Sequence, residues 1–447
     1  MIRRYLAALL AIFAAGGIGT AFAQPPDAKR SGGGEIEYRV RPGDTLYGLA
    51  ARGFLRVRDY RVVQARNRIS DPRKLHAGTV MRIPLRLLRI QPVSARIAAY
   101  RGKVTVDGGD ARIGMSVAAG TDIVTQSNAF ATVELADGSR LTVPSGSSLH
   151  IAELHRVILD GRVVRRFRLS NGRVEIEAAP LQKAGDRFEV LTPISVAAVR
   201  GTRFRASYSG LADPGLAGTA ATGVIEGRVS VSGAGGERLL DSGKGVAVGS
   251  RGMGAIASLL RAPALQEPDR LQDGKIVDFA VEPMPDAGAY LAQLAADAGF
   301  VDIFAEQREE APHMRFADVP DGSFFVRLTA FSASGMEGMP SVYTFERKRN
   351  DVAASVEGIA ACPARRCLRF RWQAGGEGEA RFRFQIAPGR DAIPIIDRDG
   401  MTAREIVITD LAPGTYYWRV ESARVDGGRR IARWTEYQEL QVTPLKR

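Results

Sequence analysis

Two stretches in the second half of the chain repeat each other at a fixed distance. Residues 318–330, DVPDGSFFVRLTA, match residues 410–422, DLAPGTYYWRVES, with an offset of 92 positions. The same offset aligns YLAQLA at 290–295 with FRFQIA at 382–387. A repeat of this length, built from short alternating strands, is typical of tandem β-sandwich modules.

We expect the two copies to occupy residues 274–349 and 350–447. All three tryptophans of the chain fall in the second copy, at Trp372, Trp418 and Trp434. Large aromatic side chains dominate the cores of small β-sandwiches. We therefore expect the tryptophans to be core residues rather than an exposed platform for sugar stacking.

Residues 96–250 alternate polar and apolar positions in short runs separated by turn dipeptides. Asp-Gly or Asn-Gly pairs occur at 137–138, 160–161 and 171–172. Such pairs favour tight hairpins, because the favoured turn needs positive φ at both central positions. No helical period of useful length interrupts the pattern, so we expect an all-β domain here and a connector at 251–273.

Residues 36–86 have a different pattern. The two ends of this stretch alternate like strands, and apolar residues spaced for one helical face lie between them. We expect one helix to begin at Thr45, with Asp44 as its cap, and a second to cover 59–66. The predicted order is β-α-α-β, so the whole chain is predicted to be multidomain and mainly β.

The first residues predict export. Residues 1–23 combine a short basic start, an apolar run and an Ala-Phe-Ala cleavage site, which is typical of a signal peptide. The alternative is an uncleaved anchor helix, but four glycine and threonine residues weaken the run as a membrane span. Only four residues precede the run, so we expect no cytoplasmic segment. Residues 24–35 are rich in Pro, Gly and Ser and predict a flexible linker.

The chain contains two cysteines, Cys362 and Cys367, in the sequence CPARRC. Export places them in an oxidising compartment, where a small disulfide loop is expected. No further metal-ligand residues lie close in sequence, so we expect no zinc site. Alkylation without reductant followed by mass spectrometry tests the disulfide: two alkylated thiols would contradict it.

Positive charge is concentrated near the N-terminus. The formal net charge of the chain is +13, and residues 38–86 hold twelve Lys and Arg against three Asp, a net +9. In an exported protein this excess favours an anionic envelope polymer or membrane surface over nucleic acid. The alternative is a solvated basic face without a partner.

The first module resembles the LysM family, whose members bind glycans containing N-acetylglucosamine, such as peptidoglycan. The resemblance covers nearly all of 38–84 and rests on Tyr-x-Val-x-x-Gly-Asp-Thr-Leu at 38–46, Leu-Ala at 49–50, and Ile-Pro at 83–84, together with Asn67, Leu75 and Gly78. In the family, ligand contacts come from the loop after the first strand and the loop between the second helix and the second strand. The resemblance therefore implies a glycan site at Gly43, Asp44, Thr45, Leu46, Asn67, Arg68, Ile69 and Ser70.

The chemistry of the first loop agrees with this implication. Glycine at position 43 would let the backbone approach a flat sugar face. Free amides at a helix start could donate to acetamide carbonyl oxygens. The alternative is that Asp44 and Thr45 only cap the helix. One copy of the module predicts weak affinity, because tandem copies would be needed for avidity.

The all-β region resembles the FecR domain of periplasmic proteins. The resemblance covers about 100–250 and rests above all on VLTPISVAAVRGTRFRA at 190–206. Within that run we expect Arg200-Gly201-Thr202 to form a structural turn, with Gly201 in an unusual backbone conformation; the alternative is a ligand contact. Family members that regulate iron uptake control a sigma factor through a cytoplasmic segment, which is not expected here.

The C-terminal pair resembles fibronectin type III-like modules. The sequence LAPGTYYWRV at 411–420 is similar to the start of the family's sixth strand. The resemblance implies that Tyr416 or Tyr417 supplies a hydroxyl group that hydrogen-bonds back to the preceding corner. The similarity is clearer for the second copy than for the first.

No catalytic set of residues is apparent in the sequence. The four histidines are scattered, and none forms a zinc-peptidase motif. Glu175 and Glu177 share one face of a predicted strand, which we expect to be solvated. We therefore predict a non-enzymatic protein with no metal and no cofactor.

The leading hypothesis is a periplasmic envelope protein that binds peptidoglycan through its first module and presents its β-domains to an envelope protein partner. Nucleic acid is not expected as a partner. The alternative is a FecR-like sensor of a cell-surface signalling pathway that acts through a separate membrane partner. A third hypothesis is a wall enzyme whose active site the sequence does not reveal.

Overall fold

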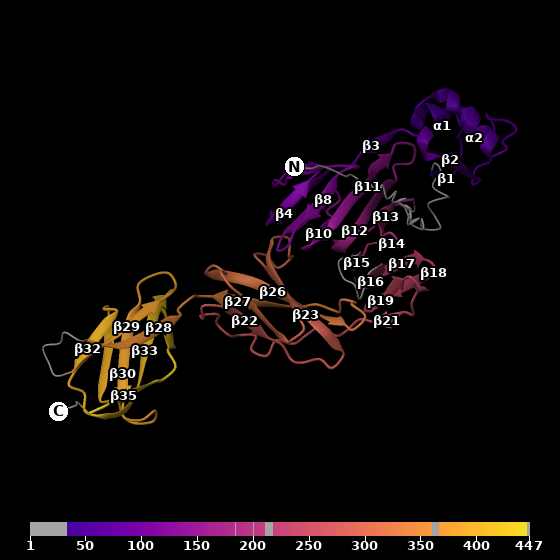
Figure 1. The fold of residues 1–447 in the computed structure, drawn as a ribbon. Coiled ribbons are helices and arrows are strands. Elements are labelled where there is room, and N and C mark those ends of the chain that lie inside the picture. The colour runs from indigo at the N-terminus through magenta and orange to yellow at the C-terminus, as the bar shows by residue number, and fades with distance from the viewer. Residues whose placement is uncertain (1–33, 184, 200, 211–217, 360–365, 445–447) are drawn as a thin grey trace, which may run out of the picture.

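The structure is a computed structural model that describes residues 34–183, 185–199, 201–210, 218–359 and 366–444. Four folded units follow one another along the chain (Figure 1), here named the N-terminal module (34–89), the central domain (90–258), the first sandwich (259–349) and the second sandwich (350–444). The predicted mainly β, multidomain fold is confirmed. The expected signal peptide and most of the expected linker at 24–35 lie outside the described residues. In the described part of the chain, no helix has the length and apolar character needed to cross a membrane.

The N-terminal module has the predicted β-α-α-β order. Its elements are β1 (Glu35–Arg39), α1 (Leu46–Gly53), η1 (Val57–Asp59), α2 (Tyr60–Arg66), β2 (Val80–Pro84) and η2 (Leu85–Leu87). β1 and β2 pair antiparallel, with Tyr38 opposite Met81. α1 buries Leu46, Leu49 and Ala50 on one face, as the helical spacing of its apolar residues requires.

The core of this module is completed by the central domain. Val157 is fully buried and packs with the module's own apolar residues. An added Cβ on Gly53 would lie 2.6 Å from the Cβ of Leu159, so the end of α1 sits directly on the central domain. The Nη2 of Arg162 also donates to the carbonyl oxygen of Glu37 at 2.7 Å. The two units are thus packed together rather than joined by a free linker.

The central domain is a closed barrel with one continuous apolar core. Its strands are β3 (Ile90–Pro92), β4 (Ala95–Arg101), β5 (Val104–Val106), β6 (Gly109–Asp110), β7 (Ser116–Val117), β8 (Asp122–Thr125), β9 (Phe130–Leu135), β10 (Arg140–Val143), β11 (Ser148–Val157), β12 (Val163–Glu177), β13 (Arg187–Leu191), β14 (Ser195–Val199), β15 (Arg203–Ser209), β16 (Thr219–Glu226), β17 (Arg228–Gly233), β18 (Gly236–Asp241), β19 (Lys244–Gly249), β20 (Gly252–Met253) and β21 (Ala257–Ser258). Neighbouring strands pair antiparallel, except that β12 and β13 are parallel. No helix occurs among the described residues of this domain, in agreement with the all-β prediction.

The predicted hairpin at Asn171-Gly172 is wrong. Both residues lie inside β12, which continues through them and passes from β11 on one side to β15 on the other. Gly172 has a φ of +85°, and an added Cβ there would lie 2.4 Å from the Oγ of Ser147. The glycine therefore allows β12 to bend where it passes from one sheet to the other. Glycine has the same role at barrel corners.

The other two turn dipeptides do connect paired strands. Gly138 (φ +83°) lies between β9 and β10, and Gly161 (φ +72°) lies between β11 and β12. The aspartate before each glycine does not have positive φ, so neither turn is of the predicted mirror-image type. Gly201 has a φ of +75°, and an added Cβ there would lie 2.9 Å from the Cα of Pro180, which confirms its unusual backbone conformation. Arg200 lies outside the described residues.

Residues 251–273, expected to be a connector, pack against units on both sides. β20 and β21 pair with β19 and complete the central domain. Leu265 is buried in the core of the first sandwich and bridges to Val281, and Gln272 bridges to Arg347. Little of this segment is left as a linker, because its apolar residues are used by the neighbouring cores.

Each sandwich consists of two layers. The first contains β22 (Val277–Ala280), β23 (Ala287–Ala295), β24 (Ile303–Glu309), β25 (His313–Phe316), β26 (Gly322–Ser332) and β27 (Ser341–Arg347), in sheets β22-β25 and β24-β23-β26-β27. The second contains β28 (Val352–Gly358), β29 (Cys367–Ala374), β30 (Arg381–Ala387), β31 (Ile396–Met401), β32 (Glu405–Thr409), β33 (Gly414–Asp426), β34 (Arg429–Trp434) and β35 (Gln438–Val442). Its sheets are β28-β29-β32 and β31-β30-β33-β34, with β35 also paired to β33.

The sequence repeat corresponds to equivalent strands. β23 and β30 lie at the same place in the larger sheet of their sandwiches, as do β26 and β33. The two loops that lead into β26 and β33 place Asp318 (φ +56°) and Asp410 (φ +50°) in the same left-handed conformation. The prediction of two sandwiches of one fold is therefore confirmed.

The second sandwich contains the corner hydrogen bond that the family resemblance implied. The hydroxyl of Tyr416 donates to the carbonyl oxygen of Ala412 at 3.1 Å. Trp372 and Trp418 are buried in the core as predicted, whereas Trp434 lies outside it and stacks on the guanidinium of Arg419. Cys367 is buried at the start of β29, and Cys362 lies outside the described residues, so the disulfide stays a prediction.

Candidate functional site

The loop after β1 turns at Gly43. This residue has a φ of +83°, and an added Cβ would meet no atom within 4 Å. The left-handed conformation explains why glycine stands here, and the open space shows that the position faces solvent. Gly43 is therefore both a structural turn residue and an accessible one.

Asp44 does not cap α1. Its carboxylate is buried and accepts hydrogen bonds from the Tyr38 hydroxyl and the Arg41 amide, both at 2.8 Å, and from Arg52 Nη2 at 2.7 Å. Burial alone would raise the pKa of Asp44, but these hydrogen bonds and the charge of Arg52 lower the pKa below its ordinary value. The carboxylate holds the loop in shape and has little capacity left for a ligand.

The cap of α1 is Thr45, whose Oγ1 accepts from the amide of Gly48 at 3.0 Å. The predicted helix is confirmed, but its start and its capping residue each lie one position later than predicted, at Leu46 and Thr45. Leu46 is fully buried, so its side chain belongs to the core rather than to a ligand surface. Its amide donates to the carbonyl oxygen of Pro72 at 2.9 Å, which brings the two predicted loops together.

The side-chain amide of Asn67, in the second loop, is used in hydrogen bonds within the module. Its Nδ2 donates to the carbonyl oxygens of Val63 and Arg82, and its Oδ1 accepts from the amide of Arg82 at 2.7 Å. These contacts clamp the end of α2 to β2. Asn67 is thus a structural residue of the site.

The rest of the second loop is more accessible. Arg68 is exposed with a φ of +54°, and Ser70 is exposed, while Ile69 is half-buried against the module's core. Of the eight predicted residues, Gly43, Arg68 and Ser70 present an open surface. The others support the two loops.

An exposed aromatic residue next to this surface was missed by the sequence reasoning. Tyr47 follows the capping residue Thr45 and the buried Leu46 at the start of α1. Of its surface, 62% is exposed. Its ring meets that of Tyr60 edge to face, with centroids 6.3 Å apart. Aromatic faces are common partners of apolar sugar faces. The signal in the sequence was a tyrosine on the solvent side of an amphipathic helix.

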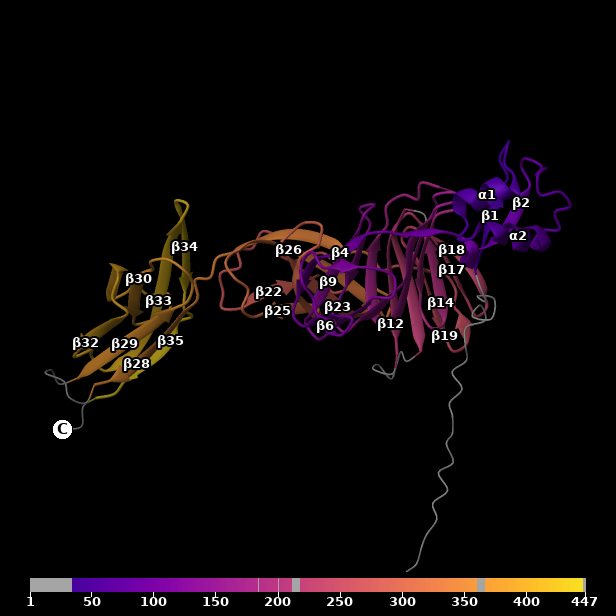
Figure 2. The same ribbon diagram turned by 90° about the horizontal axis from the view of Figure 1, so that it is seen from above.

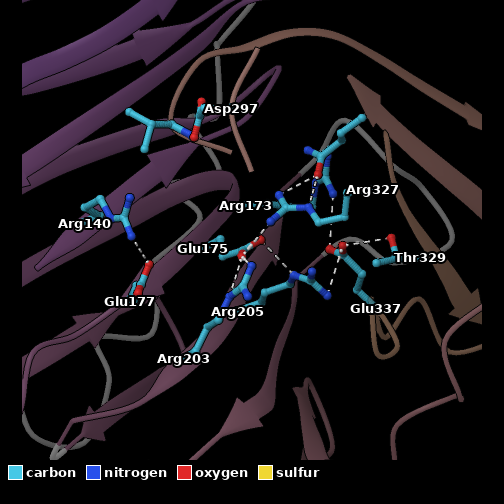
Figure 3. Close-up of polar contacts among 12 residues, drawn as sticks. Arg140, Arg173, Glu175, Glu177, Arg203, Arg205, Asp297, Arg327, Thr329 and Glu337 are labelled. Carbon is cyan, nitrogen blue, oxygen red and sulfur yellow. Dashed lines mark hydrogen bonds and ion pairs between the residues drawn. The ribbon is translucent and has the colours of Figure 1, made fainter. Parts of the chain in front are cut away.

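A second group of residues gathers carboxylates in a buried place, as a catalytic site would. Glu175 of β12 lies at the interface of the central domain and the first sandwich, and its side chain is only 11% exposed (Figure 3). The prediction of a solvated strand face is therefore wrong for Glu175. It holds for Glu177, whose side chain is 54% exposed and pairs with Arg140 at 2.7 Å.

Three arginines converge on the Glu175 carboxylate. Arg203 Nη2 and Arg327 Nη1 donate to its Oε1 at 2.8 and 2.9 Å, and Arg205 Nε donates to its Oε2 at 3.1 Å. Burial alone would raise the pKa of Glu175, but the nearby guanidinium groups lower it far below its ordinary value.

Two further glutamates of the first sandwich complete this cluster. Glu337 pairs with Arg173 at 3.2 Å and with Arg205 at 3.3 Å, and Glu306 pairs with Arg173 at 2.7 Å. The charges of Arg205 and Arg173 lower the pKa of Glu337 although burial opposes this. Glu175 and Glu337 have lowered pKa values and are paired with arginines, so they are poor general acids or bases, and the cluster connects the two domains.

No metal centre appears in the described part of the chain: it contains no group of three or more His, Cys, Asp or Glu side chains arranged to hold an ion. His150 pairs with Asp122 at 2.8 Å, while His155 is buried elsewhere in the central domain. Burial lowers the pKa of His155 below its ordinary value.

Comparison with known families agrees with the two N-terminal units. The family described as LysM domain matches residues 38–84, and the family described as FecR protein matches residues 121–230. The chain contains a LysM domain and a FecR domain. Both families are binding or regulatory domains, and both are typical of proteins outside the cytoplasm. No curated protein matches the chain.

Solved structures resemble parts of the chain. Two structures of a putative anti-sigma factor from Parabacteroides distasonis are 17% identical, with TM-scores of 0.25 and 0.26; they cover 31% and 32% of this chain and 59% and 68% of theirs. Fibronectin(III)-like modules of Clostridium thermocellum CbhA are 15% identical, with a TM-score of 0.17, and cover 40% of this chain and 94% of theirs. The chain thus spans about three fifths of the first of these structures.

Proposed function

We propose that this protein is a non-enzymatic protein of the periplasm that binds peptidoglycan through its LysM domain and holds its β-domains beside the wall as a scaffold for an envelope protein partner. The observation that carries the proposal is the hydrogen bond between the Leu46 amide and the Pro72 carbonyl oxygen. It joins the loop after β1 to the loop after α2, which supports a shared ligand surface that includes Gly43 and Ser70.

The exposed ring of Tyr47 supports a sugar ligand for this surface. A sugar ring has an apolar face that packs on an aromatic side chain and polar edges that bond to backbone groups. The net charge of +9 over 38–86 also favours a polymer that carries negative charge. The proposed contacts are Gly43, Tyr47, Arg68 and Ser70, with Asp44, Thr45, Leu46, Asn67 and Ile69 as supports.

Incubation of the exported chain with purified sacculi tests this proposal. The protein is expected to sediment with the sacculi and to release no soluble muropeptides; release would indicate an enzyme. The Tyr47→Ala variant should sediment less. Leu55→Ala is the matched control, because Leu55 lies in the same module and is 63% exposed. Equal sedimentation of the two variants would remove Tyr47 from the site.

A second candidate function is a sensor that acts through a separate membrane partner, and the FecR match over 121–230 favours it. Crosslinking of the exported chain in cell envelopes distinguishes the two functions. Recovery of an inner-membrane regulator would favour the sensor, and recovery of wall-associated proteins alone would favour the scaffold.

A further inference from the structure

An open crevice lies between the LysM domain and the central domain. It has a volume of about 1280 Å³, and its walls include β1, Pro42, Gly78 and Arg82 on one side and Arg162, Lys183 and Arg187 on the other. In the view of Figure 2 the LysM domain lies beside the central domain, on the side away from the two sandwiches. The Arg162 contact with the Glu37 carbonyl oxygen bridges the two walls.

Three of the four acidic residues that line this crevice already have partners. Glu35 pairs with Arg66 at 2.9 Å, and Asp160 pairs with Arg162 at 2.6 Å. The Asp186 carboxylate accepts three backbone amide hydrogen bonds, from Val163, Gln182 and Lys183. Among the described lining carboxylates, Glu37 and Asp186 have no cationic partner, and Asp186 is already satisfied by its backbone amides.

The basic residues of the crevice are in the opposite situation. Arg39 bonds only the carbonyl oxygen of Gly78, and Lys183 bonds only the carbonyl oxygens of Asp160 and Gly161. A carbonyl contact leaves the positive charge uncompensated. The described exposed cations of the lining that pair with no carboxylate are Arg39, Arg41, Arg82, Lys183 and Arg187.

The crevice is continuous with the loop proposed to bind glycan. Arg41 and Pro42 line it, and Gly43 follows them directly at the exposed turn. A polymer bound at Gly43 therefore has its next groups beside unpaired guanidinium groups. Guanidinium groups match the geometry of carboxylates and bind them through paired hydrogen bonds.

We propose that this crevice binds the carboxylate-bearing peptide stems attached to the glycan, so that the central domain forms half of the ligand site. The inference rests on the proposed glycan-binding function. It gives the central domain a direct role in recognition: Lys183 and Arg187 contact the peptide while the LysM loops contact the sugar. Affinity for stem-bearing fragments is then salt-dependent, because exposed charges are screened by ions.

The test compares two ligands with the exported chain: chitin oligomers, which carry no peptide, and soluble wall fragments that carry stem peptides. The Arg82→Gln/Arg187→Gln variant removes one unpaired cation from each wall. We expect it to bind stem-bearing fragments about three- to tenfold more weakly, as expected for two exposed charge pairs. Binding of chitin oligomers should stay unchanged.

The matched control is Arg58→Gln/Arg251→Gln, which removes the same charge from exposed positions outside the crevice. It should bind both ligands like the parent. Fragments with amidated stem carboxylates should bind the parent and the crevice variant equally. If the crevice variant binds unmodified fragments like the parent, or if it loses chitin binding in parallel, the inference is overturned. If the parent binds neither ligand, the proposed glycan function itself fails.

Discussion

Arg327 of the first sandwich donates to Glu175 of the central domain at 2.9 Å, across a separation of 152 positions in the chain. The same guanidinium group donates to the Oε1 of Gln293 and lies over the ring of Phe300, 4.5 Å from its centroid. A buried carboxylate shared by three arginines joins the two domains (Figure 3). These domains are therefore expected to move as one unit.

Replacement of Glu175 by glutamine should separate this unit. It would leave Arg203, Arg205 and Arg327 without their shared anion, and breaking a buried pair in this way costs about 3–5 kcal/mol. Thermal unfolding should show an earlier transition, and small-angle scattering should show a less rigid particle. Glu177→Gln is the control, because its exposed pair with Arg140 is worth at most about 1 kcal/mol. Equal effects of the two changes would contradict the role of Glu175.

The same cluster predicts a loss of stability in acid. The folded-state pKa of Glu175 is far below its ordinary value, so its contribution is fully present above the unfolded pKa of about 4.3 and is lost as the pH falls below it. Urea unfolding measured between about pH 5 and pH 2 should show this decline, with a slope of up to about 1.4 kcal/mol per pH unit from this one group. The decline should be shallower in Glu175→Gln, and an unchanged slope would count against the prediction.

The sequence predicted well those parts of the fold that depend on local patterns. The helices of the LysM domain depend on residues three or four positions apart, so periodicity located α1 and α2. The repeat at 318–330 and 410–422 located β26 and β33 because each sandwich repeats the same local pattern. The burial of Glu175 depends on Arg327 in another domain, and no local pattern reveals that contact.

The candidate site was predicted with the same mixture of success and error. The resemblance to the LysM family located both loops, and the Leu46–Pro72 contact brings them together. The roles of individual residues differed, because Asp44 finds Tyr38 and Arg52 only once β1 and α1 pack. Tyr47 was missed because the family resemblance implied contacts from the two loops, although the helical spacing of Leu46, Leu49 and Ala50 already indicates that position 47 faces solvent.

The assignment of Thr45 as the cap and Asp44 as a buried acceptor predicts a different cost for the loss of each side chain. Thr45→Ala should cost about 1 kcal/mol, the usual loss for an N-cap. Asp44→Ala should cost about 1–3 kcal/mol, because it leaves the Tyr38 hydroxyl and the Arg41 amide without their buried acceptor. Chemical denaturation that follows the LysM domain measures both losses. A larger loss for Thr45→Ala than for Asp44→Ala would contradict the role of Asp44 as a buried acceptor.

The two adjacent tyrosines of the second sandwich should differ in a similar way. Tyr416→Phe removes the corner hydrogen bond to Ala412 and should destabilise the sandwich by about 1 kcal/mol. Tyr417→Phe removes only an exposed contact with Glu439 and should have little effect. The first sandwich already has Phe324 at the position equivalent to Tyr416. Equal melting temperatures for the two variants would show that the corner bond is dispensable here as well.

The last prediction separates the two roles of Gly43. Its φ of +83° is costly for residues with a side chain, by about 1–2 kcal/mol, and asparagine tolerates the left-handed region best. Because an added Cβ meets no atom within 4 Å, the cost is conformational rather than a clash. Gly43→Val should lower the melting temperature, and Gly43→Asn should lower it much less. If Gly43 also faces the glycan, Gly43→Asn should still weaken binding to chitin oligomers in titrations run well below its melting temperature. Undiminished binding by a folded Gly43→Asn variant would assign Gly43 to the turn alone and move the ligand contact toward Tyr47 and Ser70.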